Sequence, residues 1–393
     1  MDLNLEKKNI LYVVPSMNSG GVEIGIVDIA RQNHIKKRFN MFVLSSGGLL
    51  RNKLINSGTE VIFLNVKTKN PFKIFFNIKK IEKILIEKKI DLVSAESRAP
   101  AWSCYFACKK LNIPLVSTIH GAYDNSLGIF SPLKKLYNSI MCRCENIIFV
   151  SEYVMEYSLK YFKKYIAGKN KVKNTAVIPR GIDQGIFNVN NINQNRVVAI
   201  QEELKIPDDK IIITLPARFT KIKGHMYFLK VLRFLALYCQ NFLCVMVGDI
   251  KKHPKFLKSL QKHITKYGLS GFIKIHGDIN DITALYTLSN IIVSSSTKAE
   301  SFGRVSIEAQ SMGKIFVGTD LGGTLETVID GETGFLAPHN DERIFARILL
   351  KIINMSQQEK DEIGKAAVKN GKKYSLDIMY DKTVEFYEHI LRA

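Results

Sequence analysis

The stretch that decides the fold lies near the start of the chain and reads ILYVVPSMNSGGVEIGIVDIARQN, residues 10–33. An apolar, β-branched run, Ile10–Val14, leads through a short polar segment to Gly20 and Gly21, and a helical pattern follows over Val22–Asn33. Glycines between a strand and a helix let backbone N–H groups approach a ligand, and the helix dipole favours an anion there. A glycine pair is also an ordinary tight turn. The segment therefore predicts a strand, loop and helix, and it predicts a phosphate site only together with other motifs.

The same alternation continues along the chain. Apolar runs separated by helix-length intervals occur at Met41–Leu44, Val61–Leu64, Leu92–Ala95, Leu115–Thr118, Ile147–Val150 and Ala176–Ile178. After a polar, Asn-rich segment, Asn188–Asn195, they resume at Ile211–Leu215, Leu243–Val247, Phe272–Ile275, Ile291–Val293 and Ile315–Val317. Runs without internal polar alternation are typical of parallel strands covered on both faces. The sequence thus predicts an α/β chain with two doubly wound sheets.

At 393 residues the chain exceeds one ordinary domain. We take Asn188–Asn195 as the linker, so the predicted domains are residues 1–187 and 188–372. No strand run follows Glu342, and we expect residues 373–393 to form a helix that packs back toward the first domain.

Composition limits the possible partners. The chain has 57 Lys and Arg against 36 Asp and Glu, a formal charge of +21. This excess favours an anionic partner, either nucleic acid, an anionic membrane surface or a phosphorylated substrate, although many lysines simply decorate solvated faces.

The six cysteines lack the two-residue spacing of zinc or redox pairs, and the polar start is not a signal peptide, so we expect a cytoplasmic protein with buried thiols. The longest uncharged stretch, Phe234–Gly248, is too short to span a bilayer.

Two basic segments of the first domain are candidate membrane contacts. In Phe72–Lys89, a helical stripe of Ile74, Ile78, Ile81 and Leu85 lies among six lysines, and it suits either lipid headgroups or an ordinary helix facing the sheet. The second segment mixes lysines with aromatic residues: Lys160, Lys163, Lys164, Lys169, Lys171 and Lys173 with Tyr157, Tyr161, Phe162 and Tyr165.

Two motifs of the second domain carry candidate chemistry. The run Ile211–Leu215 leads into PARFTKIKGH, which places Arg218 and Lys223 after the carboxyl end of a parallel strand, where ligands of such sheets bind. A guanidinium and an ammonium together neutralise a diphosphate.

The second motif follows Ile291–Val293 and contains Glu300 in a loop and Glu308 in the second turn of a helix. A carboxylate accepts hydrogen bonds from neighbouring hydroxyls, so Glu308 suits a ribose and Glu300 a transferred sugar. The segment Ser301–Arg304 opens the helix, and its N–H groups are predicted to point at phosphate.

Taken in order, these motifs resemble the family 4 retaining glycosyltransferases, which have the GT-B fold. The matching segments are Gly20-Gly21-Val22-Glu23, Ile119-His120-Gly121, Val150-Ser151-Glu152, Ile178-Pro179-Arg180-Gly181-Ile182-Asp183 with Phe187, Arg218 with Lys223-Gly224, Glu300 and Glu308 with Phe302-Gly303 between them, and Gly322-Gly323, Glu326, Gly331 and Gly334. Two departures are Ala217 in place of a glycine and Arg180 where the family often has Asn; neither is expected to touch the chemistry directly.

The resemblance implies two Rossmann-like domains facing each other across a cleft, the first on the acceptor side and the second holding a nucleotide-sugar such as a UDP- or GDP-sugar. Its implied catalytic residues are Glu300, His120, Arg218 and Lys223, and its implied donor-binding residues are Gly20, Gly21, Arg218, Lys223, Ser301, Phe302, Gly303, Arg304 and Glu308. No Asp-x-Asp pair occurs, in agreement with transfer that uses no metal and no cofactor.

The resulting hypothesis is a hexosyltransferase that retains configuration and acts on a glycan or lipid-linked acceptor in cell-envelope polysaccharide or lipopolysaccharide synthesis. We expect it in the cytoplasm, with a peripheral contact to the cytoplasmic face of the inner membrane through the first domain. A nucleotide-sugar epimerase of the same architecture is the nearest alternative. A nucleic-acid-binding protein is suggested by charge alone, but no nucleic-acid-binding module appears in the sequence.

Overall fold

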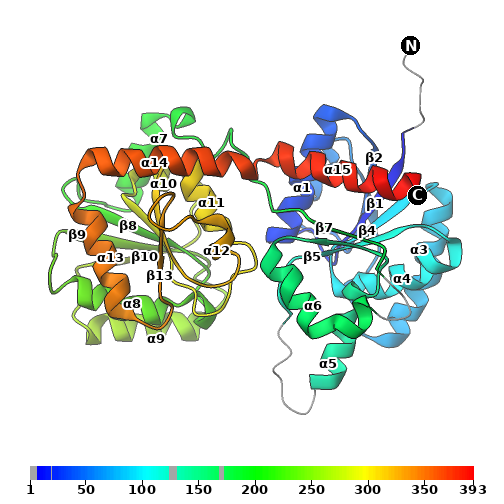
Figure 1. The fold of residues 1–393 in the computed structure, drawn as a ribbon, viewed down its shortest axis with the longest axis horizontal. Coiled ribbons are helices and arrows are strands. Elements are labelled where there is room, and N and C mark those ends of the chain that lie inside the picture. Colours follow the sequence, from blue (N-terminus) through cyan, green and yellow to red (C-terminus); the bar gives the residue numbers. More distant parts are fainter. Residues whose placement is uncertain (1–6, 19, 124–130, 168–171) are drawn as a thin grey trace. The chain divides into compact units, whose positions relative to one another are not determined.

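A computed structural model describes residues 7–18, 20–123, 131–167 and 172–393 of the chain. It confirms the α/β class, because parallel strands alternate with helices throughout (Figure 1). The chain divides into two compact units: Met1–Gly181 with Leu376–Ala393, and Ile182–Ser375. The boundaries predicted from the sequence lie after residues 187 and 372. The Asn-rich segment taken as a linker lies inside the second unit.

The described strands of the first unit form a seven-stranded parallel sheet in the order β3-β2-β1-β4-β5-β6-β7. These strands are β1 (Asn9–Val13), β2 (Asn40–Ser45), β3 (Glu60–Phe63), β4 (Leu92–Ala95), β5 (Leu115–Ile119), β6 (Asn146–Phe149) and β7 (Asn174–Val177). β1 is an interior strand, since Ile10 is in register with Met41 on one side and Leu92 on the other. Successive strands are added outward from β1 in both directions, which is the doubly wound arrangement.

Helices cover both faces of this sheet (Figure 1). They are α1 (Gly21–Lys36), α2 (Arg51–Ile55), α3 (Pro71–Glu87), α4 (Arg98–Leu111), α5 (Ser131–Asn138), η2 (Ser139–Cys142), α6 (Glu152–Ile166) and α15 (Leu376–Arg392). α1 and α15 pack together on one face, where Ile26, Tyr380 and Tyr387 are buried. α3, α4, η2 and α6 cover the other face. The last helix of the chain therefore completes the core of the first unit.

The second unit repeats the architecture with six described strands in the order β10-β9-β8-β11-β12-β13, all parallel. They are β8 (Ile211–Pro216), β9 (Phe242–Val247), β10 (Ile273–His276), β11 (Ile291–Ser294), β12 (Ile315–Thr319) and β13 (Phe335–Ala337). The sequence analysis missed β13, because three residues between glycine-rich turns and a proline are too short to give a recognisable apolar run.

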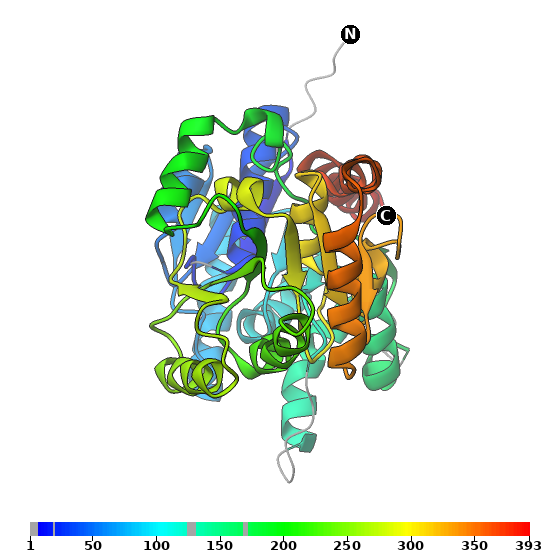
Figure 2. The same ribbon diagram turned by 90° about the vertical axis from the view of Figure 1, so that its left-hand side faces the viewer.

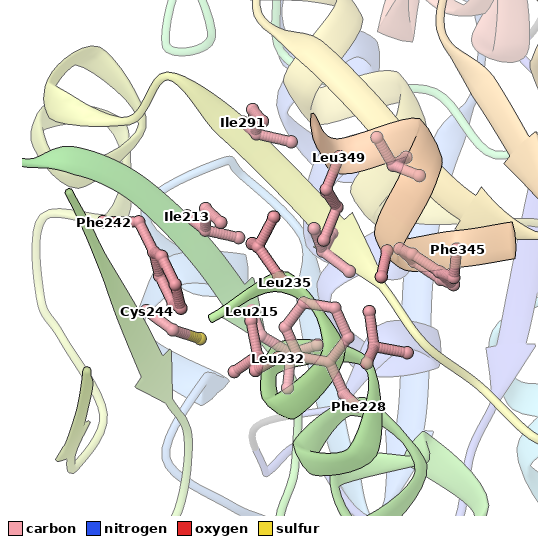
Figure 3. Packing of buried hydrophobic residues seen from close by; sticks show 14 of the residues in the cluster. Ile213, Leu215, Phe228, Leu232, Leu235, Phe242, Cys244, Ile291, Phe345 and Leu349 are labelled. Atoms are coloured by element: carbon pink, nitrogen blue, oxygen red, sulfur yellow. The ribbon is translucent and has the colours of Figure 1, made fainter. Parts of the chain in front are cut away.

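The helices of this unit also lie on both faces of its sheet (Figures 1 and 2). They are η3 (Val189–Asn191), α7 (Gln194–Glu203), η4 (Lys221–Lys223), α8 (His225–Leu235), α9 (Pro254–Lys266), α10 (Ile282–Leu288), α11 (Arg304–Ser311), α12 (Thr324–Thr327), α13 (Glu342–Asn354), α14 (Gln357–Gly371) and η5 (Lys372–Tyr374). Figure 3 shows side chains of α8 and α13, such as Phe228 and Phe345, packed against strand residues such as Leu215. This apolar core fixes the strand ends that bear the polar loops.

The basic helix predicted from Phe72–Lys89 is α3, and its isoleucine stripe faces inward. Ile81 and Leu85 are fully buried in the core, and Ile78 packs against it. The interpretation as an ordinary core-facing stripe is thus confirmed for these residues.

All six cysteines are free thiols, and Cys239 is the only one that is not buried. In the part of the chain that the structure describes, no helix is long and apolar enough to cross a bilayer.

Candidate active site

The candidate site of the second unit lies where the sheet order reverses. β8 and β11 are neighbours, while the strands that follow each of them lie on opposite sides. Loops leaving such adjacent strands diverge, and ligands of open α/β sheets bind in the crevice between them. Arg218 and Lys223 follow β8, and Glu300 follows β11. The structure therefore brings the two predicted motifs to one place, although they are about 80 residues apart in sequence.

Lys223 and Glu300 form an ion pair at this point. The Lys223 ammonium donates to Glu300 Oε1 at 2.6 Å, and the hydroxyl of Ser296 donates to the same oxygen. The two charged side chains are about one-fifth exposed, 21% and 20%, so solvent reaches the pair. Arg218 is exposed at the start of the same loop. Lys223, which is predicted to bind the diphosphate, and Glu300, which is predicted to bind the sugar, are thus paired with each other in this structure.

Two glycines hold the Glu300 loop in place. Gly322 forms a parallel bridge with Glu300, and the N–H of Gly323 donates to the Glu300 carbonyl at 2.7 Å. A Cβ at Gly323 would lie 2.5 Å from the Cα of Phe302, and one at Gly322, which has a φ of 60°, would lie 2.3 Å from the Glu300 carbonyl oxygen. Only glycine permits this approach. The loop after β12 therefore sets the position of the Glu300 backbone.

Glu308 lies in the second turn of α11, where the sequence analysis placed it. Its Oε1 accepts from Arg304 Nε at 2.8 Å, and its Oε2 accepts from the buried Tyr286 hydroxyl at 3.1 Å. Burial, and then the Glu308 charge, raise the pKa of Tyr286 well above its ordinary value, so this phenol stays a donor. The Glu308 side chain is only 12% exposed and has a fixed orientation.

The start of α11 presents backbone rather than side chains. Gly303 is the N-cap residue, with a φ of 81°, and no side chain caps the first turn. Phe302 is 6% exposed, and its ring packs against Tyr374 at 5.7 Å, so the side chain belongs to the core. The predicted phosphate role of Ser301–Arg304 therefore rests on N–H groups at the positive end of a helix.

In the first unit, His120 is held between two charged side chains. It follows β5, and Glu96 follows the adjacent strand β4. The ring Nε2 lies 2.8 Å from Glu96 Oε2, and Arg180 Nη2 lies 2.8 Å from Nδ1. A guanidinium only donates, so Nδ1 is the acceptor and Nε2–H donates to the carboxylate. We call Glu96, His120 and Arg180 the histidine triad.

The surroundings keep the imidazole neutral. Burial lowers the pKa of His120, the charge of Arg180 lowers it further, and the hydrogen bond to Glu96 only partly opposes them. Burial alone would raise the pKa of Glu96, but hydrogen bonds from His120 and Ser94 and the charge of Arg180 bring it below its ordinary value. The triad thus contains a carboxylate, a neutral imidazole and a guanidinium.

Arg180, for which no direct part in the chemistry was expected, contacts the predicted site residue His120. Its guanidinium reaches His120, and it lies against α1, where a Cβ at Gly25 would be 1.9 Å from Nη1. Both ring nitrogens of His120 are engaged within the first unit, so the predicted contact of this residue with sugar or reacting oxygens stays a prediction.

The predicted glycine loop of the first unit begins α1. Gly20 is the N-cap residue, and Gly21 is the first residue of the helix. The carboxylate of Glu23 folds back over this end, because a Cβ at Gly20 would lie 2.3 Å from Glu23 Oε2. Ser19, Lys169 and Lys171 lie outside the described residues. Within the residues that are described, no group of three or more His, Cys, Asp and Glu side chains forms a metal site.

Comparison with known proteins identifies the family. Residues 198–373 match the model of glycosyl transferases group 1, and residues 19–185 match the model of glycosyltransferase family 4. A crystal structure of a glycosyltransferase from Rickettsia africae is 34% identical, covers 98% of this chain and 99% of that one, and has a TM-score of 0.88. The chain belongs to the family 4, group 1 glycosyltransferases.

More distant relatives of this glycosyltransferase agree with that assignment. The capsular polysaccharide biosynthesis glycosyltransferase CapM of Staphylococcus aureus is 26% identical over 231 residues, and the match spans 58% of the length of each chain. The structure of Anabaena HepE in complex with UDP-glucose is 22% identical, covers 97% of this chain and 99% of that one, and has a TM-score of 0.80. At that identity the likeness concerns the fold, which is GT-B.

The sequence motifs of this glycosyltransferase revealed neither Glu96 nor the contact of Arg180 with His120. Glu96 directly follows the buried run Leu92–Ala95, and a charged residue at the carboxyl end of a parallel strand was the available signal. Tyr286, the donor to Glu308, gave no such signal, because its α10 position looks like any core aromatic.

Proposed function

We propose that this glycosyltransferase transfers a hexose from a UDP- or GDP-sugar to a glycan or lipid-linked acceptor, with retention of configuration and without metal or cofactor. The observation that carries the proposal is the Lys223–Glu300 pair, which lies at the switch point of the second unit, where α11 also begins. This arrangement offers cations and N–H groups to a diphosphate, and carboxylates to hydroxyl groups.

The Lys223–Glu300 ion pair suggests how a donor would enter. A diphosphate carries more negative charge than one carboxylate, so it would replace Glu300 as the partner of Lys223 and release Glu300 to sugar hydroxyls. During transfer, charge grows on the leaving diphosphate, and Lys223, Arg218 and the N–H groups at the start of α11 would stabilise it. Cationic side chains would thus stabilise the leaving charge in place of a divalent metal ion.

We assign Glu308 to the ribose of the donor. Tyr286 and Arg304 hold its carboxylate in a fixed orientation, and an oriented carboxylate suits a vicinal diol. The first unit would supply the acceptor side through His120. Because His120 is held neutral, we assign it a hydrogen-bonding rather than an ionic role.

The cell-envelope role is proposed from the name of the CapM relative, and the nucleotide-sugar donor is supported by the UDP-glucose bound to HepE. A cytoplasmic location is proposed because the six cysteines are free thiols, as in reducing compartments.

The donor site is tested by comparing Lys223→Ala with Lys221→Ala. The two lysines flank the same short turn, η4, but only Lys223 bonds Glu300. Lys223→Ala is expected to reduce kcat about 100-fold to 1000-fold, as loss of a group that stabilises the leaving charge does. Lys221→Ala should change kcat less than about threefold. Equal rates for the two variants would show that the diphosphate binds elsewhere.

The donor, the stereochemistry and the metal requirement can be measured with the same purified protein. UDP-, GDP- and ADP-sugars are screened for thermal stabilisation, and the anomer of the product is followed by NMR. We expect an unchanged anomer and full activity after treatment with EDTA. Release of UDP or GDP only in the presence of an acceptor supports transfer, whereas interconversion of donor sugars without acceptor would favour the epimerase alternative.

A further inference from the structure

The outer face of α3 carries large apolar side chains that no described residue of the first unit covers. Phe72 is 77% exposed, and Phe75, Phe76 and Ile86 are each 63% exposed. These residues lie on the side of the helix opposite Ile81, which is fully buried. Packing of the inward isoleucine stripe therefore does not explain all the apolar residues of this helix, because three phenylalanines within five residues point away from the core.

Lysines share this outer face. Lys73, Lys79, Lys80 and Lys83 are exposed, and residues 67–89 contain eight lysines against two glutamates. Both glutamates are compensated, Glu82 by Lys110 at 2.6 Å and Glu87 by Lys83 at 3.5 Å. Among the described residues, Lys73, Lys79 and Lys80 have no acidic partner. The face thus combines a cluster of rings with uncompensated positive charge, and we call it the Phe/Lys face.

The Phe/Lys face is presented rigidly. Asn70 caps the helix by accepting from the N–H groups of Phe72 and Lys73, and Pro71 occupies the first turn. α4 packs along the helix, and Ile81 and Leu85 anchor it in the core. The 17-residue helix is roughly 25 Å long. Its exposed residues recur at intervals of three and four, so they form one continuous side of the helix.

We propose that the Phe/Lys face docks this protein on an anionic lipid bilayer, with α3 lying parallel to the surface. The phenylalanine rings would insert at the boundary between headgroups and acyl chains, and the lysine ammonium groups would lie among phosphate headgroups. A bilayer takes up rings and cations interspersed on one face, since apolar and anionic layers lie a few ångströms apart. A protein partner would instead have to match each unpaired lysine with its own acidic group.

The second basic segment is less suited to this role. In α6, Phe162 is fully buried, and Tyr157 and Tyr161 lie against each other at 4.4 Å. Lys173 is paired with Glu145 at 2.8 Å. These rings and this cation already have partners within the first unit, so α3 is the contact that we propose.

The inference deepens the proposed function, because a lipid-linked acceptor would be held in the same bilayer, but it stands on α3 alone. Vesicle binding needs no sugar nucleotide, and donor binding needs no vesicle. Failure of one test therefore leaves the other intact.

The test is sedimentation of the full chain with vesicles of phosphatidylcholine alone and of equal parts phosphatidylcholine and phosphatidylglycerol. We expect binding to the anionic vesicles, lost steeply as salt is raised. Replacing all three rings, Phe72→Ser with Phe75→Ser and Phe76→Ser, should weaken partitioning about tenfold or more. Removing the three unpaired charges, Lys73→Gln with Lys79→Gln and Lys80→Gln, should weaken it about 100-fold.

Matched controls lie in the second unit. Leu237→Ser with Tyr238→Ser removes two side chains that are 70% and 76% exposed. Lys255→Gln with Lys258→Gln and Lys262→Gln removes three exposed lysines from α9. Both controls should bind like the unchanged protein, and all variants should keep its circular dichroism.

Three outcomes would overturn the inference: no binding to either vesicle, equal binding to both, or α3 variants that bind as well as the controls. Equal losses in the α3 and α9 lysine variants would also overturn it, because they would show diffuse attraction of a basic protein.

Discussion

At the scale of single residues, the histidine triad explains why the pKa of a histidine at a strand end is lowered. Arg180 donates to one ring nitrogen of His120, and Glu96 accepts from the other. Ser94 and Thr118 donate to Glu96 Oε1 at 2.8 and 3.2 Å, so this carboxylate is well satisfied although buried. Protonating His120 would place a second positive charge beside Arg180, which disfavours the imidazolium.

The triad therefore makes stability fall in mild acid. A lowered pKa in the folded state means that, below the ordinary histidine pKa of about 6.5, the unfolded chain binds a proton that the folded chain does not. His120 thus contributes stability above that pH, and the contribution is lost as pH falls from there toward the folded value. Replacement by glutamine, which does not titrate, should make the first unit less sensitive to pH, by at most about 1.4 kcal/mol per pH unit.

The measurement is urea unfolding at about pH 7.5 and about pH 5.5, above the range where ordinary carboxylates titrate. The only tryptophan of the chain, Trp102, lies in α4 of the first unit, so its fluorescence reports that unit. This choice also avoids a contribution from His225, a buried histidine of the second unit whose pKa burial lowers to about 4. Identical pH dependence in His120→Gln and the unchanged protein would contradict the assignment.

The sequence predicted single residues well where they belonged to motifs. Lys223, Glu300 and Glu308 lie on the loop and helix positions expected of them. What it did not reveal are contacts between motifs, such as the donation from Arg180 to His120 across 60 residues. Such contacts depend on strand order and side-chain rotamers, and a single sequence specifies neither.

At the scale of elements, the second unit shows how short loops fix a site on a rigid sheet. The loops after β11 and β12 are joined through Glu300, Gly322 and Gly323. β11 and β12 are adjacent strands in register, so the loops leave the sheet side by side. Because glycine brings their backbones together, movement of one loop has to move the other.

Gly323→Ala tests this contact between the two loops. Its Cβ would meet the Phe302 backbone at 2.5 Å, and backbone yields less easily than a flexible side chain. We expect a loss of about 1–3 kcal/mol in the free energy of unfolding, as in overpacked sites, together with a higher KM for the donor. The matched control is Gly271→Ala in the same unit, where an added Cβ would meet nothing within 4 Å. A normal KM in Gly323→Ala would show that the contact between the two loops does not position Glu300.

Elements were predictable because parallel strands and their covering helices leave long, regular apolar patterns. Every predicted strand run corresponds to an observed strand, with ends shifted by at most two residues. The exceptions have physical reasons. β13 is too short to show a period, and the two faces of α3 are both apolar, so the stripe alone did not reveal that the phenylalanines point outward.

At the scale of the whole molecule, the second unit is inserted into the first. Residues 182–375 form one compact body, and the chain then returns to the first unit as α15. That helix buries Leu376, Met379, Tyr380, Val384 and Tyr387 in the core of the first unit. Tyr380 and Tyr387 also bond Asn33 at 2.7 Å and Ser94 at 3.0 Å. The first unit is therefore incomplete without the last residues of the chain.

Deletion of residues 376–393 is expected to unfold the first unit selectively. Burial of each large apolar side chain contributes roughly 1.5–3 kcal/mol, and several such losses exceed the whole stability of an ordinary domain, about 5–15 kcal/mol. Trp102 fluorescence should shift to that of a solvent-exposed ring, while stabilisation of the second unit by UDP or GDP persists. Deletion of only Arg392 and Ala393, both exposed, is the control. Native Trp102 fluorescence in the longer deletion would contradict this dependence.

Because α15 belongs to the first unit, the second unit is the first to be synthesised in full, although it begins later in the sequence. The seven described strands of the first sheet lie before residue 178, yet α15, which covers one of its faces, is synthesised only after the second unit. The second unit starts later in the sequence, but all of its residues, 182–375, are synthesised before α15. During translation the first unit therefore keeps an uncovered apolar surface, which chaperones can bind, until residues 376–392 have been synthesised.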